Sequence, residues 1–345
     1  MCKFSEIQTS FYQSDLWLNY LKKIYPYAGR IYRFGLVGQF FEVQTKIAGK
    51  GWIFPHAPYK YKFDSDFNVE QLVSFINYTK EQARKRRVDF IKLVPMLVYS
   101  KKCFSLLKKK LKFLRSPKQY EYASWHAFLS LDEYKGNNTL IRFRKSTRYL
   151  IRRTSKSFLV EIKNIRNVDN IELKHFWQGL KAYSRRNSHV ISFENLLLLK
   201  QLLGMNNNQS GDANGILLGS IRCQLPKCQK KHVGYGIFPY FKKRIFYQYS
   251  SFSKEYPQYG ISHILIYDII KYGLIHNFKY LSLWGVNLPD SKFRIKNWQG
   301  FTNFKLGFRP NTVKLIGPLV LPITARGKLA YIRDLVGHVR LVLNV

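Results

Sequence analysis

The sequence predicts a mixed α/β protein made of two related units. The chain has 345 residues, which is long enough for two domains that each bury a core of their own. Strand patterns lead into amphipathic helix patterns and then into further strands, and this succession occurs twice. The composition, 46% hydrophobic and 16% aromatic without a low-complexity tract, is typical of a globular protein. We expect a first domain over residues 1–138 and a second over residues 139–312.

The first half opens with a helix pattern over residues 14–24, in which Ser14 suits the N-cap position. Residues 35–38 carry the glycines expected of a turn between the first two strands. The remaining expected elements are strands at 30–34, 39–47 and 52–54, a helix at 69–86, a strand at 89–94, a helix at 101–111 and a strand at 125–131.

The second half repeats the alternation and begins with a strongly basic helix. Residues 139–156 contain seven lysines or arginines and no acid, and Arg144, Arg148 and Arg152 are four apart, so they share one helix face. The other expected elements are strands at 160–165, 216–223, 233–238, 244–250 and 280–284, helices at 170–187, 193–203 and 261–276, and a connector at 206–215.

The C-terminal segment has a helical pattern of its own. After about Ala325, apolar residues recur at helical spacing. They are Leu329, Ile332, Leu335, Val336 and Val339. We expect residues 313–345 to pack back onto the first domain.

The charge is extreme. Only 20 acidic residues oppose 58 lysines and arginines, which gives a net charge of +38. A genome rich in A and T explains many lysines but not the shortage of acids. Such a chain favours polyanionic partners, namely nucleic acid, anionic lipid headgroups or a diphosphate ligand.

The chain shows no targeting or membrane-spanning signal. Its first residues lack the apolar core of a signal peptide, and no run of eighteen apolar residues occurs. We expect a cytoplasmic monomer with no more than peripheral contact to an anionic membrane. Cys223 and Cys228 flank a hairpin turn near His232, but a zinc site needs a fourth ligand. We therefore expect reduced cysteines and neither a metal nor a cofactor.

One short segment suggests chemistry. Phe304-Lys305-Leu306-Gly307-Phe308 places a lysine between two aromatic residues in a strand-like pattern. An ammonium held against aromatic faces is partly desolvated and can stabilise the negative charge that develops on a reacting carbonyl oxygen. The alternative is a solvated lysine between two core aromatics.

Five motifs stand in a fixed order along the chain. They are the basic helix Lys145-Ser146-Thr147-Arg148-Tyr149-Leu150-Ile151-Arg152-Arg153, the element Tyr183-Ser184-Arg185-Arg186-Asn187, the strand Tyr247-Gln248-Tyr249-Ser250-Ser251, the strand end Trp284-Gly285-Val286, and the lysine segment with Ile316-Gly317-Pro318 after it. In this order they resemble the Fem family of aminoacyltransferases, which build peptidoglycan interpeptide bridges. The resemblance covers most of residues 140–322 and, more weakly, residues 10–135.

The resemblance implies a fold and a reaction. The fold is two domains of the acetyltransferase (GNAT) type, in the short form without the long helical arm. The reaction moves an amino acid from aminoacyl-tRNA to the amine of the stem peptide in a lipid-linked or UDP-linked peptidoglycan precursor. This role belongs to cell-wall biogenesis and cell shape.

The resemblance also implies residue roles. Lys305 would stabilise the tetrahedral oxyanion, and Phe304 would position the terminal adenosine or the lysine itself. Arg185 or Arg186 would bind the diphosphate of the precursor. Tyr247 and Tyr249 alternate along an expected strand and so share a face, from which one could hydrogen-bond the acceptor. Plain core packing of these aromatics, and a solvated helix end for the two arginines, are the alternatives.

The basic helix is expected to contact tRNA phosphates, which position a protein without reading sequence. A solvated basic face is the alternative. The residues concerned are Arg144, Lys145, Arg148, Arg152 and Arg153.

Departures from the family pattern concern the acceptor side. The family usually has Arg-Gly-Pro where this chain has His56-Ala57-Pro58, and often Asp-Pro where Val94-Pro95 stands. Arg309 replaces a glycine after the lysine segment. The acceptor could therefore be an unusual stem peptide, or lie outside the cell wall.

Two rival functions come from the same sequence. One is an N-acyltransferase that uses acyl-CoA or an acyl carrier, but its pyrophosphate loop fails at Pro257-Gln258-Tyr259-Gly260-Ile261-Ser262, with proline first and serine last. The other is a non-enzymatic protein that binds RNA or an anionic membrane. No Walker A or dinucleotide fingerprint is present, and the histidines form no catalytic pattern.

Overall fold

The computed structural model describes most of the chain in two compact units. The described residues are 10–60, 69–116, 125–135, 139–183, 191–205, 214–228, 231–288 and 298–343. Unit 1 combines residues 1–126, 285–302 and 312–345, and unit 2 combines residues 127–284 and 303–311. Each unit holds a mixed sheet with helices against it, so the expected α/β class is confirmed.

Unit 1 is built on a sheet of short strands in the order β1-β2-β3-β5-β15-β6, with β4 paired to β2. Strands β3 and β5 run parallel, and β15 runs antiparallel to both β5 and β6. The strands are β1 (Ala28–Arg33), β2 (Leu36–Thr45), β3 (Gly49–Phe54), β4 (Tyr59–Lys60), β5 (Phe90–Leu93), β6 (Leu114–Arg115) and β15 (Leu319–Pro322).

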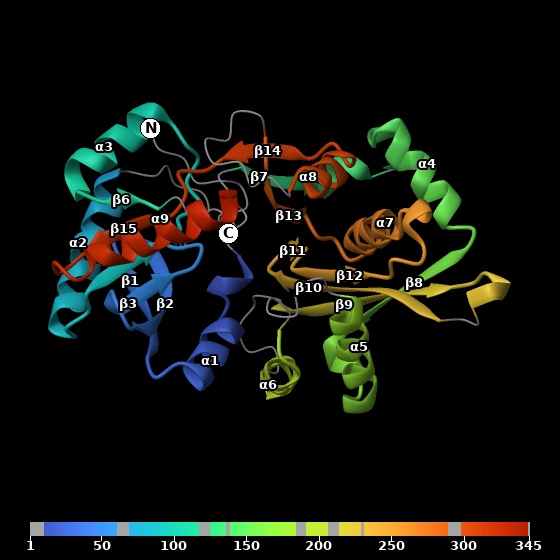
Figure 1. Cartoon of the computed structure of the whole chain (residues 1–345), viewed down its shortest axis with the longest axis horizontal. Helices are drawn as coiled ribbons and strands as arrows, with labels where there is room; N and C mark the ends of the chain where they lie inside the picture. Colours follow the sequence, from blue (N-terminus) through green and yellow to red (C-terminus); the bar gives the residue numbers. More distant parts are fainter. Residues whose placement is uncertain are drawn as a thin grey trace. The chain divides into compact units, whose positions relative to one another are not determined.

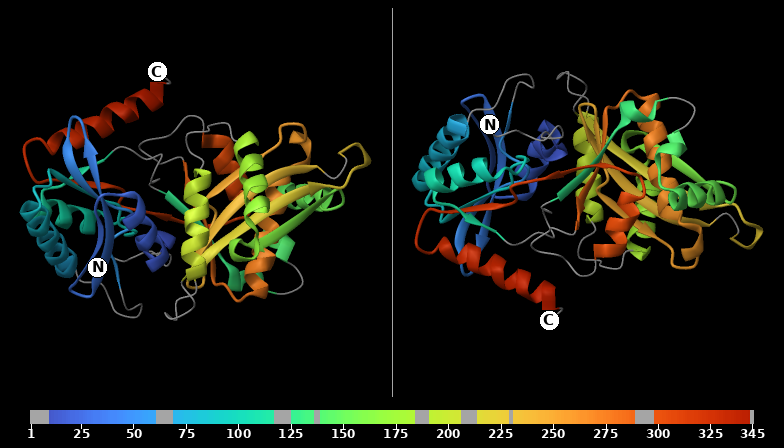
Figure 2. Two further views of the ribbon diagram at one scale, coloured as in Figure 1. Left: turned by 90° about the horizontal axis from the view of Figure 1, so that it is seen from below. Right: turned by 90° about the horizontal axis from the view of Figure 1, so that it is seen from above.

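Helices cover both faces of this sheet. Leu72 of α2 (Val69–Lys85) and Leu107 of α3 (Lys101–Leu111) pack with Phe54 in one apolar core. Ala330 of α9 (Lys328–Leu343) packs with Phe90 in a second, smaller core. Figure 2 shows α9 on the side of the sheet opposite α2 and α3.

Helix α1 (Asp15–Ile24) begins as expected, because the Ser14 hydroxyl accepts a hydrogen bond from the Trp17 backbone N–H at 3.1 Å. The turn after β1 is tighter than predicted. Phe34 and Gly35 take positive φ angles of 56° and 72° between strands paired in register, which is the pattern of a two-residue hairpin turn. Gly38 lies inside β2, so the turn expected over residues 35–38 is wrong in extent.

Unit 2 is built on a sheet in the order β7-β13-β11-β10-β9-β8, with β12 also paired to β10. Strands β11 and β13 are parallel, whereas β8, β9 and β10 form an antiparallel meander. The strands are β7 (Trp125–Ser130), β8 (Phe158–Asn164), β9 (Asn214–Cys223), β10 (His232–Phe241), β11 (Arg244–Phe246), β12 (Tyr249–Phe252) and β13 (Tyr280–Val286). The chain leaves unit 2 after Trp284 and returns to it for residues 303–311, and β14 (Asn311–Lys314) begins at the last of these.

The helices of unit 2 also take opposite faces of their sheet (Figure 1). Phe176 of α5 (Asn170–Tyr183) contacts Tyr235 of β10 with 5.2 Å between ring centroids. On the other face, Leu265 of α7 (Ile261–Ile275) lies where a side chain on Gly219 or Gly236 would stand. The two glycines pair across β9 and β10, so they open one shared recess for the helix. The remaining helices are α4 (Lys145–Thr154), α6 (Phe193–Met205) and α8 (Gln299–Leu306).

Four local expectations are corrected by the structure. The basic helix expected over 139–156 is a 3-10 turn at Thr139–Arg142 followed by α4. Residues 304–306 end helix α8 rather than forming a strand; Thr302 and Lys305, three residues apart, are both buried, which is helical spacing. The strand expected at 244–250 divides into β11 and β12, because β11 pairs with both β10 and β13 whereas β12 pairs with β10 alone.

The fourth correction concerns the cysteines. Cys223 at the end of β9 and Cys228 in the following turn form a disulfide with an S–S distance of 2.04 Å. The hairpin brings their Cα atoms to 5.9 Å, which is within the usual range. The described part of the chain contains no free cysteine, so the expectation of reduced thiols is wrong there.

No helix among the described residues is long and apolar enough to cross a bilayer.

Candidate functional site

The candidate site centres on Lys305 in the last turn of α8. Its side chain is only 1% exposed, among the most buried of the whole described chain. Burial lowers the pKa of the Lys305 ammonium well below its ordinary value, because the charged form loses its hydration. A lysine in such a place exchanges a proton more readily than a surface lysine, which is typical of reactive amines.

Rings from two other parts of the chain contact Phe304 and Phe308, the aromatic residues that flank Lys305 in the sequence. The ring of His263 from α7 lies 4.9 Å from Phe304 and 5.8 Å from Phe308, centroid to centroid. Tyr247, in the short link between β11 and β12, lies 6.3 Å from Phe304. The structure thus brings Tyr247 to Phe304, the residue beside Lys305, and both were predicted from sequence.

Tyr247 is held as a neutral phenol. Burial raises its pKa to about 12, although its hydrogen bond with the Ser250 hydroxyl opposes that shift. Its ring stacks on Phe238 at 5.7 Å. Tyr249 follows within β12, and burial raises its pKa as well. Since Tyr247 lies outside either strand, the prediction that the two tyrosines share a strand face is wrong.

His263 is a member of the cluster that sequence reasoning missed. It stands in the first turn of α7, and its Nδ1 atom lies 3.3 Å from the Gly260 carbonyl oxygen. Burial lowers its pKa, with the Gly260 contact opposing. The ring is therefore neutral at neutral pH. Its position three residues after Gly260 was visible in the sequence, but nothing there showed that Phe304 and Phe308 would reach it.

Helix α4 is joined directly to the lysine segment. The backbone N–H of Arg144, at the N-cap of α4, donates to the Gly307 carbonyl at 2.9 Å. A Cβ atom on Gly307 would stand 2.3 Å from the Thr147 hydroxyl oxygen, so only glycine allows this approach. The first turn of the basic helix therefore lies against Gly307, the residue that follows α8.

The five basic residues predicted to contact tRNA occupy the outer side of α4. Arg144, Lys145, Arg152 and Arg153 are exposed. Arg148 is half-buried and donates to the Ile141 carbonyl at 3.1 Å. The Arg153 guanidinium lies 5.0 Å from the centre of the Tyr259 ring. None of the five forms an ion pair with a carboxylate of the described chain, so their charge faces outward.

The two arginines predicted to bind diphosphate, and a possible metal site, complete the comparison with the sequence predictions. Arg185 and Arg186 lie outside the described residues, so their diphosphate role stays a prediction. Among the described residues, no group of three or more histidine, cysteine or acidic side chains is arranged to hold a metal ion.

Comparison of the sequence with protein-family models gave no match, and none was found among curated proteins. Solved structures do match. FemX superposes with a TM-score of 0.69 at 16% identity, over 96% of this chain and 96% of FemX. The chain has the FemX fold. This agrees with the fold that the Fem resemblance implies.

Two further structures match over most of the chain. L-PGS from Bacillus licheniformis has a TM-score of 0.58 at 12% identity, covering 91% of this chain and 89% of L-PGS. The C-terminal domain of a candidate lysylphosphatidylglycerol synthetase from Agrobacterium fabrum has a TM-score of 0.56 at 14% identity, covering 90% and 88%. At such identities the likeness concerns the fold.

Proposed function

We propose that this protein is an aminoacyltransferase that moves an amino acid from aminoacyl-tRNA to the amine of a peptidoglycan-precursor stem peptide. The observation that carries the proposal is the buried Lys305, whose pKa is lowered by burial and whose helix ends where a basic helix begins. The fold shared with FemX supports an acyltransferase, and the motifs quoted above support the aminoacyl donor.

Lys305 is proposed to move one proton and then to stabilise charge. Its neutral amine takes a proton from the acceptor ammonium, and the freed nitrogen attacks the ester carbonyl carbon of the aminoacyl-tRNA. The carbonyl electron pair moves onto oxygen, and the Lys305 ammonium, now charged, stabilises that oxyanion. When the intermediate collapses, the bond to the ribose oxygen breaks and Lys305 returns its proton to that oxygen. The attacking nitrogen releases its second proton to solvent, which leaves a neutral amide.

Helix α4 is proposed to hold the tRNA. Its outward arginines and Lys145 neutralise phosphates, while its N-cap fixes the register of the bound end relative to Lys305. Most of the free energy of reaction comes from the ester itself, so correct placement of the two substrates is the main task of the protein. Phe304 would pack against the terminal adenosine or hold Lys305 in place.

A lipid acceptor is the second candidate. It is favoured by the likeness to the candidate lysylphosphatidylglycerol synthetase domain and by the net charge of +38, which suits an anionic membrane surface. The donor and the role of Lys305 would be the same, and only the acceptor would differ. A cytoplasmic place with peripheral membrane contact is part of the proposal in both cases.

The CoA-dependent alternative has less support. The N-terminus of α7, where such enzymes bind pyrophosphate, is packed against α4: Leu150 lies 3.2 Å from the place of a Cβ atom on Gly260. The Thr154 hydroxyl donates to the Tyr259 carbonyl in the same turn. A small backbone loop open to a diphosphate is therefore absent from this part of the described chain.

The deciding experiment is a transfer assay with three acceptors and two donors. Purified protein is incubated with radiolabelled aminoacyl-tRNAs, or with labelled acetyl-CoA, in the presence of lipid-linked precursor, UDP-linked precursor or phosphatidylglycerol vesicles. We expect label to move from one tRNA species to a precursor, and Lys305→Ala to abolish it. Lys174→Ala, an exposed lysine on α5, serves as the control and should retain full activity.

Each other outcome changes the assignment. Transfer to phosphatidylglycerol supports the lipid acceptor, and acetylation from CoA supports the CoA-dependent alternative. No transfer from either donor, with tight salt-sensitive RNA binding that Lys305→Ala leaves unchanged, would support a non-enzymatic binding protein.

A further inference from the structure

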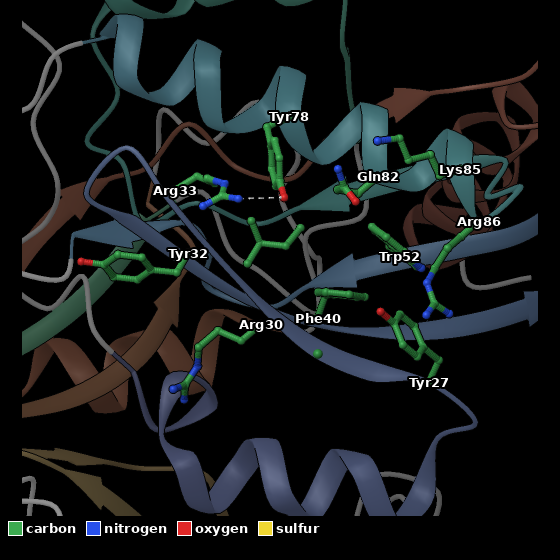
Figure 3. Close-up of a pocket in the computed structure, with 12 residues that line it drawn as sticks. Tyr27, Arg30, Tyr32, Arg33, Phe40, Trp52, Tyr78, Gln82, Lys85 and Arg86 are labelled. Atoms are coloured by element: carbon green, nitrogen blue, oxygen red, sulfur yellow. Dashed lines mark hydrogen bonds between the residues drawn. The ribbon is translucent and has the colours of Figure 1, made fainter.

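Unit 1 contains a cavity that the proposed transfer reaction does not use. It has a volume of about 450 Å³ and lies between the edge strand β1 and the C-terminal part of α2 (Figure 3). This volume is within the range of small-molecule sites. The lining side chains that matter here are Tyr27, Arg33, Trp52, Tyr78, Lys85 and Arg86.

Two arginines of the cavity are held in place by aromatic rings. The Arg86 guanidinium lies 3.7 Å from the centre of the Tyr27 ring. The Arg33 guanidinium lies 4.8 Å from the centre of the Tyr78 ring and 3.4 Å from its hydroxyl oxygen. Stacking occupies the face of a guanidinium and leaves the N–H groups at its edge for an anion. Figure 3 shows the two arginines at different ends of the cavity.

Acids balance only part of the positive charge that lines the cavity. Neither Arg33 nor Arg86 pairs with a carboxylate of the described chain, and no aspartate or glutamate lines the cavity. Lys85 and Arg30 also line the cavity, and each has an acidic partner. The Lys85 ammonium lies 2.8 Å from Glu81 one turn earlier on the helix, and Arg30 pairs with Asp15. Holding several like charges together costs free energy unless a bound anion offsets it.

The aromatic rings at the floor of the cavity and those against its two stacked arginines offer no free face on which a ligand could stack. Phe40 and Trp52 are 2% and 1% exposed, and the Trp52 indole N–H donates to the Glu42 carboxylate at 3.1 Å. Tyr27 and Tyr78 have their faces against the arginines. The site therefore favours a polar anion over an aromatic or apolar ligand.

We propose that this cavity binds the phosphate groups of a phosphate ester, with Arg33 and Arg86 as the main ligands and Lys85 as a supporting cation. Two sources share this chemistry: a soluble phosphate ester, and the phosphate of a lipid headgroup. A guanidinium binds phosphate through paired N–H donors. Because Arg33 and Arg86 lie at different ends of the cavity (Figure 3), the site suits a ligand with more than one phosphoryl group. The site is independent of Lys305 and of the proposed transfer reaction.

The test is calorimetric titration of the full chain with inorganic pyrophosphate at about 0.15 M salt, where diffuse attraction is screened. The test variant is Arg33→Gln with Arg86→Gln. The matched control is Arg84→Gln with Arg87→Gln, which removes the same charge from exposed residues beside the cavity that do not line it. We expect at least tenfold weaker binding in the test variant and less than twofold in the control.

Co-sedimentation with vesicles of phosphatidylglycerol in phosphatidylcholine distinguishes the two sources. Loss of vesicle binding in the test variant but not in the control assigns the site to a lipid headgroup. Unchanged vesicle binding, with pyrophosphate binding lost, assigns it to a soluble ester. Lys305→Ala should leave both measurements unchanged, so failure of the transfer proposal does not affect this one.

Three results would overturn the proposal: no pyrophosphate binding by the wild type, equal weakening in both double variants, or protection elsewhere in the chain. The last is measured by hydrogen exchange on the wild type alone, so it holds even if a variant misfolds. Pyrophosphate should slow exchange within residues 27–33 and 78–86.

Discussion

At the scale of single residues, Lys305 can serve as a base, as a cation beside the oxyanion, or as both in turn. Burial lowers its pKa, so the neutral amine is more accessible than in an exposed lysine. The neighbouring His263 and Tyr247 are also held uncharged, because burial lowers the pKa of the first and raises that of the second. These two uncharged neighbours therefore do not repel the positive charge that Lys305 acquires when it takes up a proton.

Replacing Lys305 by arginine separates the two roles. A guanidinium stays protonated, so Lys305→Arg keeps a cation but cannot accept a proton. We expect kcat to fall by about 10²-fold or more, nearly as far as in Lys305→Ala. In the wild type, kcat/KM should rise with pH through the lowered pKa of Lys305, since the neutral amine is the active form. If Lys305→Arg kept near wild-type turnover, Lys305 would not act as a base, and stabilisation of the oxyanion would remain as its only role.

The same pKa shift predicts how stability depends on pH. Between the lowered pKa in the folded chain and the ordinary pKa in the unfolded chain, unfolding takes up one proton at Lys305. The free energy of unfolding therefore rises with pH, by up to about 1.4 kcal/mol per unit from this group. Lys305→Met lacks the contribution. We expect urea denaturation at pH 7, 8 and 9 to show that the free energy of unfolding rises more with pH in the wild type than in Lys305→Met. An equal pH dependence in the two proteins would contradict the lowered pKa of Lys305.

At the scale of elements, the contact between α4 and the end of α8 links the basic helix to the candidate site. It depends on Gly307, beside which the Thr147 hydroxyl leaves no room for a methyl group. Residues on both sides are fixed by the bond between Arg144 and the Gly307 carbonyl. A change at this glycine therefore affects both Lys305 and the surface of α4 that we propose to bind tRNA.

We expect Gly307→Ala to destabilise the protein by about 1–3 kcal/mol and to lower transfer by displacing α4. Gly204→Ala in α6 is the matched control, because a methyl group there meets nothing within 4 Å. Its helical position should make it neutral or slightly stabilising. Thermal unfolding and the transfer assay measure both variants, and equal melting temperatures would show that the contact can rearrange.

Sequence patterns predicted most helices and strands because each has a strong local signal. Helix α1 has its serine cap, and α2 and α3 have clear apolar faces. The failures occurred where partners distant in sequence decide the structure. Residues 304–308 alternate like a strand, yet they end a helix. β15 is short, and its place follows only from pairing with β5 and β6.

The candidate site was predictable in part for the same reason. Lys305, Phe304 and Tyr247 came from motifs that stand in the sequence. His263 stood in no motif, and Thr147 stood in the basic-helix motif without an expected role. The importance of both lies in contacts with Phe304 and Gly307 that only the fold creates. The cavity of unit 1 likewise joins β1 to α2, which are about fifty residues apart.

At the scale of the whole molecule, unit 1 is discontinuous in sequence. Strand β15 lies between β5 and β6, and Asp334 of α9 accepts hydrogen bonds from Lys92 at 2.8 Å and from Ser116 at 2.7 Å. Lys92 and Asp334 are 3% and 2% exposed, so this ion pair is buried. It ties the end of the described chain to the centre of the unit 1 sheet.

Removing one partner of that pair leaves a buried charge without compensation. We expect Asp334→Asn to cost about 3–5 kcal/mol of stability, measured by urea denaturation at pH 7. Arg333→Gln, which removes an adjacent half-exposed cation, should cost less than 1 kcal/mol. The positive partners hold the pKa of Asp334 below its ordinary value. The wild type should therefore lose part of this stability as pH falls below about 4, and Asp334→Asn should not.

The position of β15 has a consequence for how the protein is made. A ribosome synthesises the first strands of unit 1 early, but it reaches residues 319–322 only after all of unit 2 has been synthesised. Until then β5 and β6 have an empty slot between them, and the nascent unit exposes open strand edges. Unit 2 can close first although it is begun second. A chain truncated before β15 would contain a complete unit 2 and an incomplete unit 1, and we expect chaperones to bind the incomplete unit or proteases to degrade it.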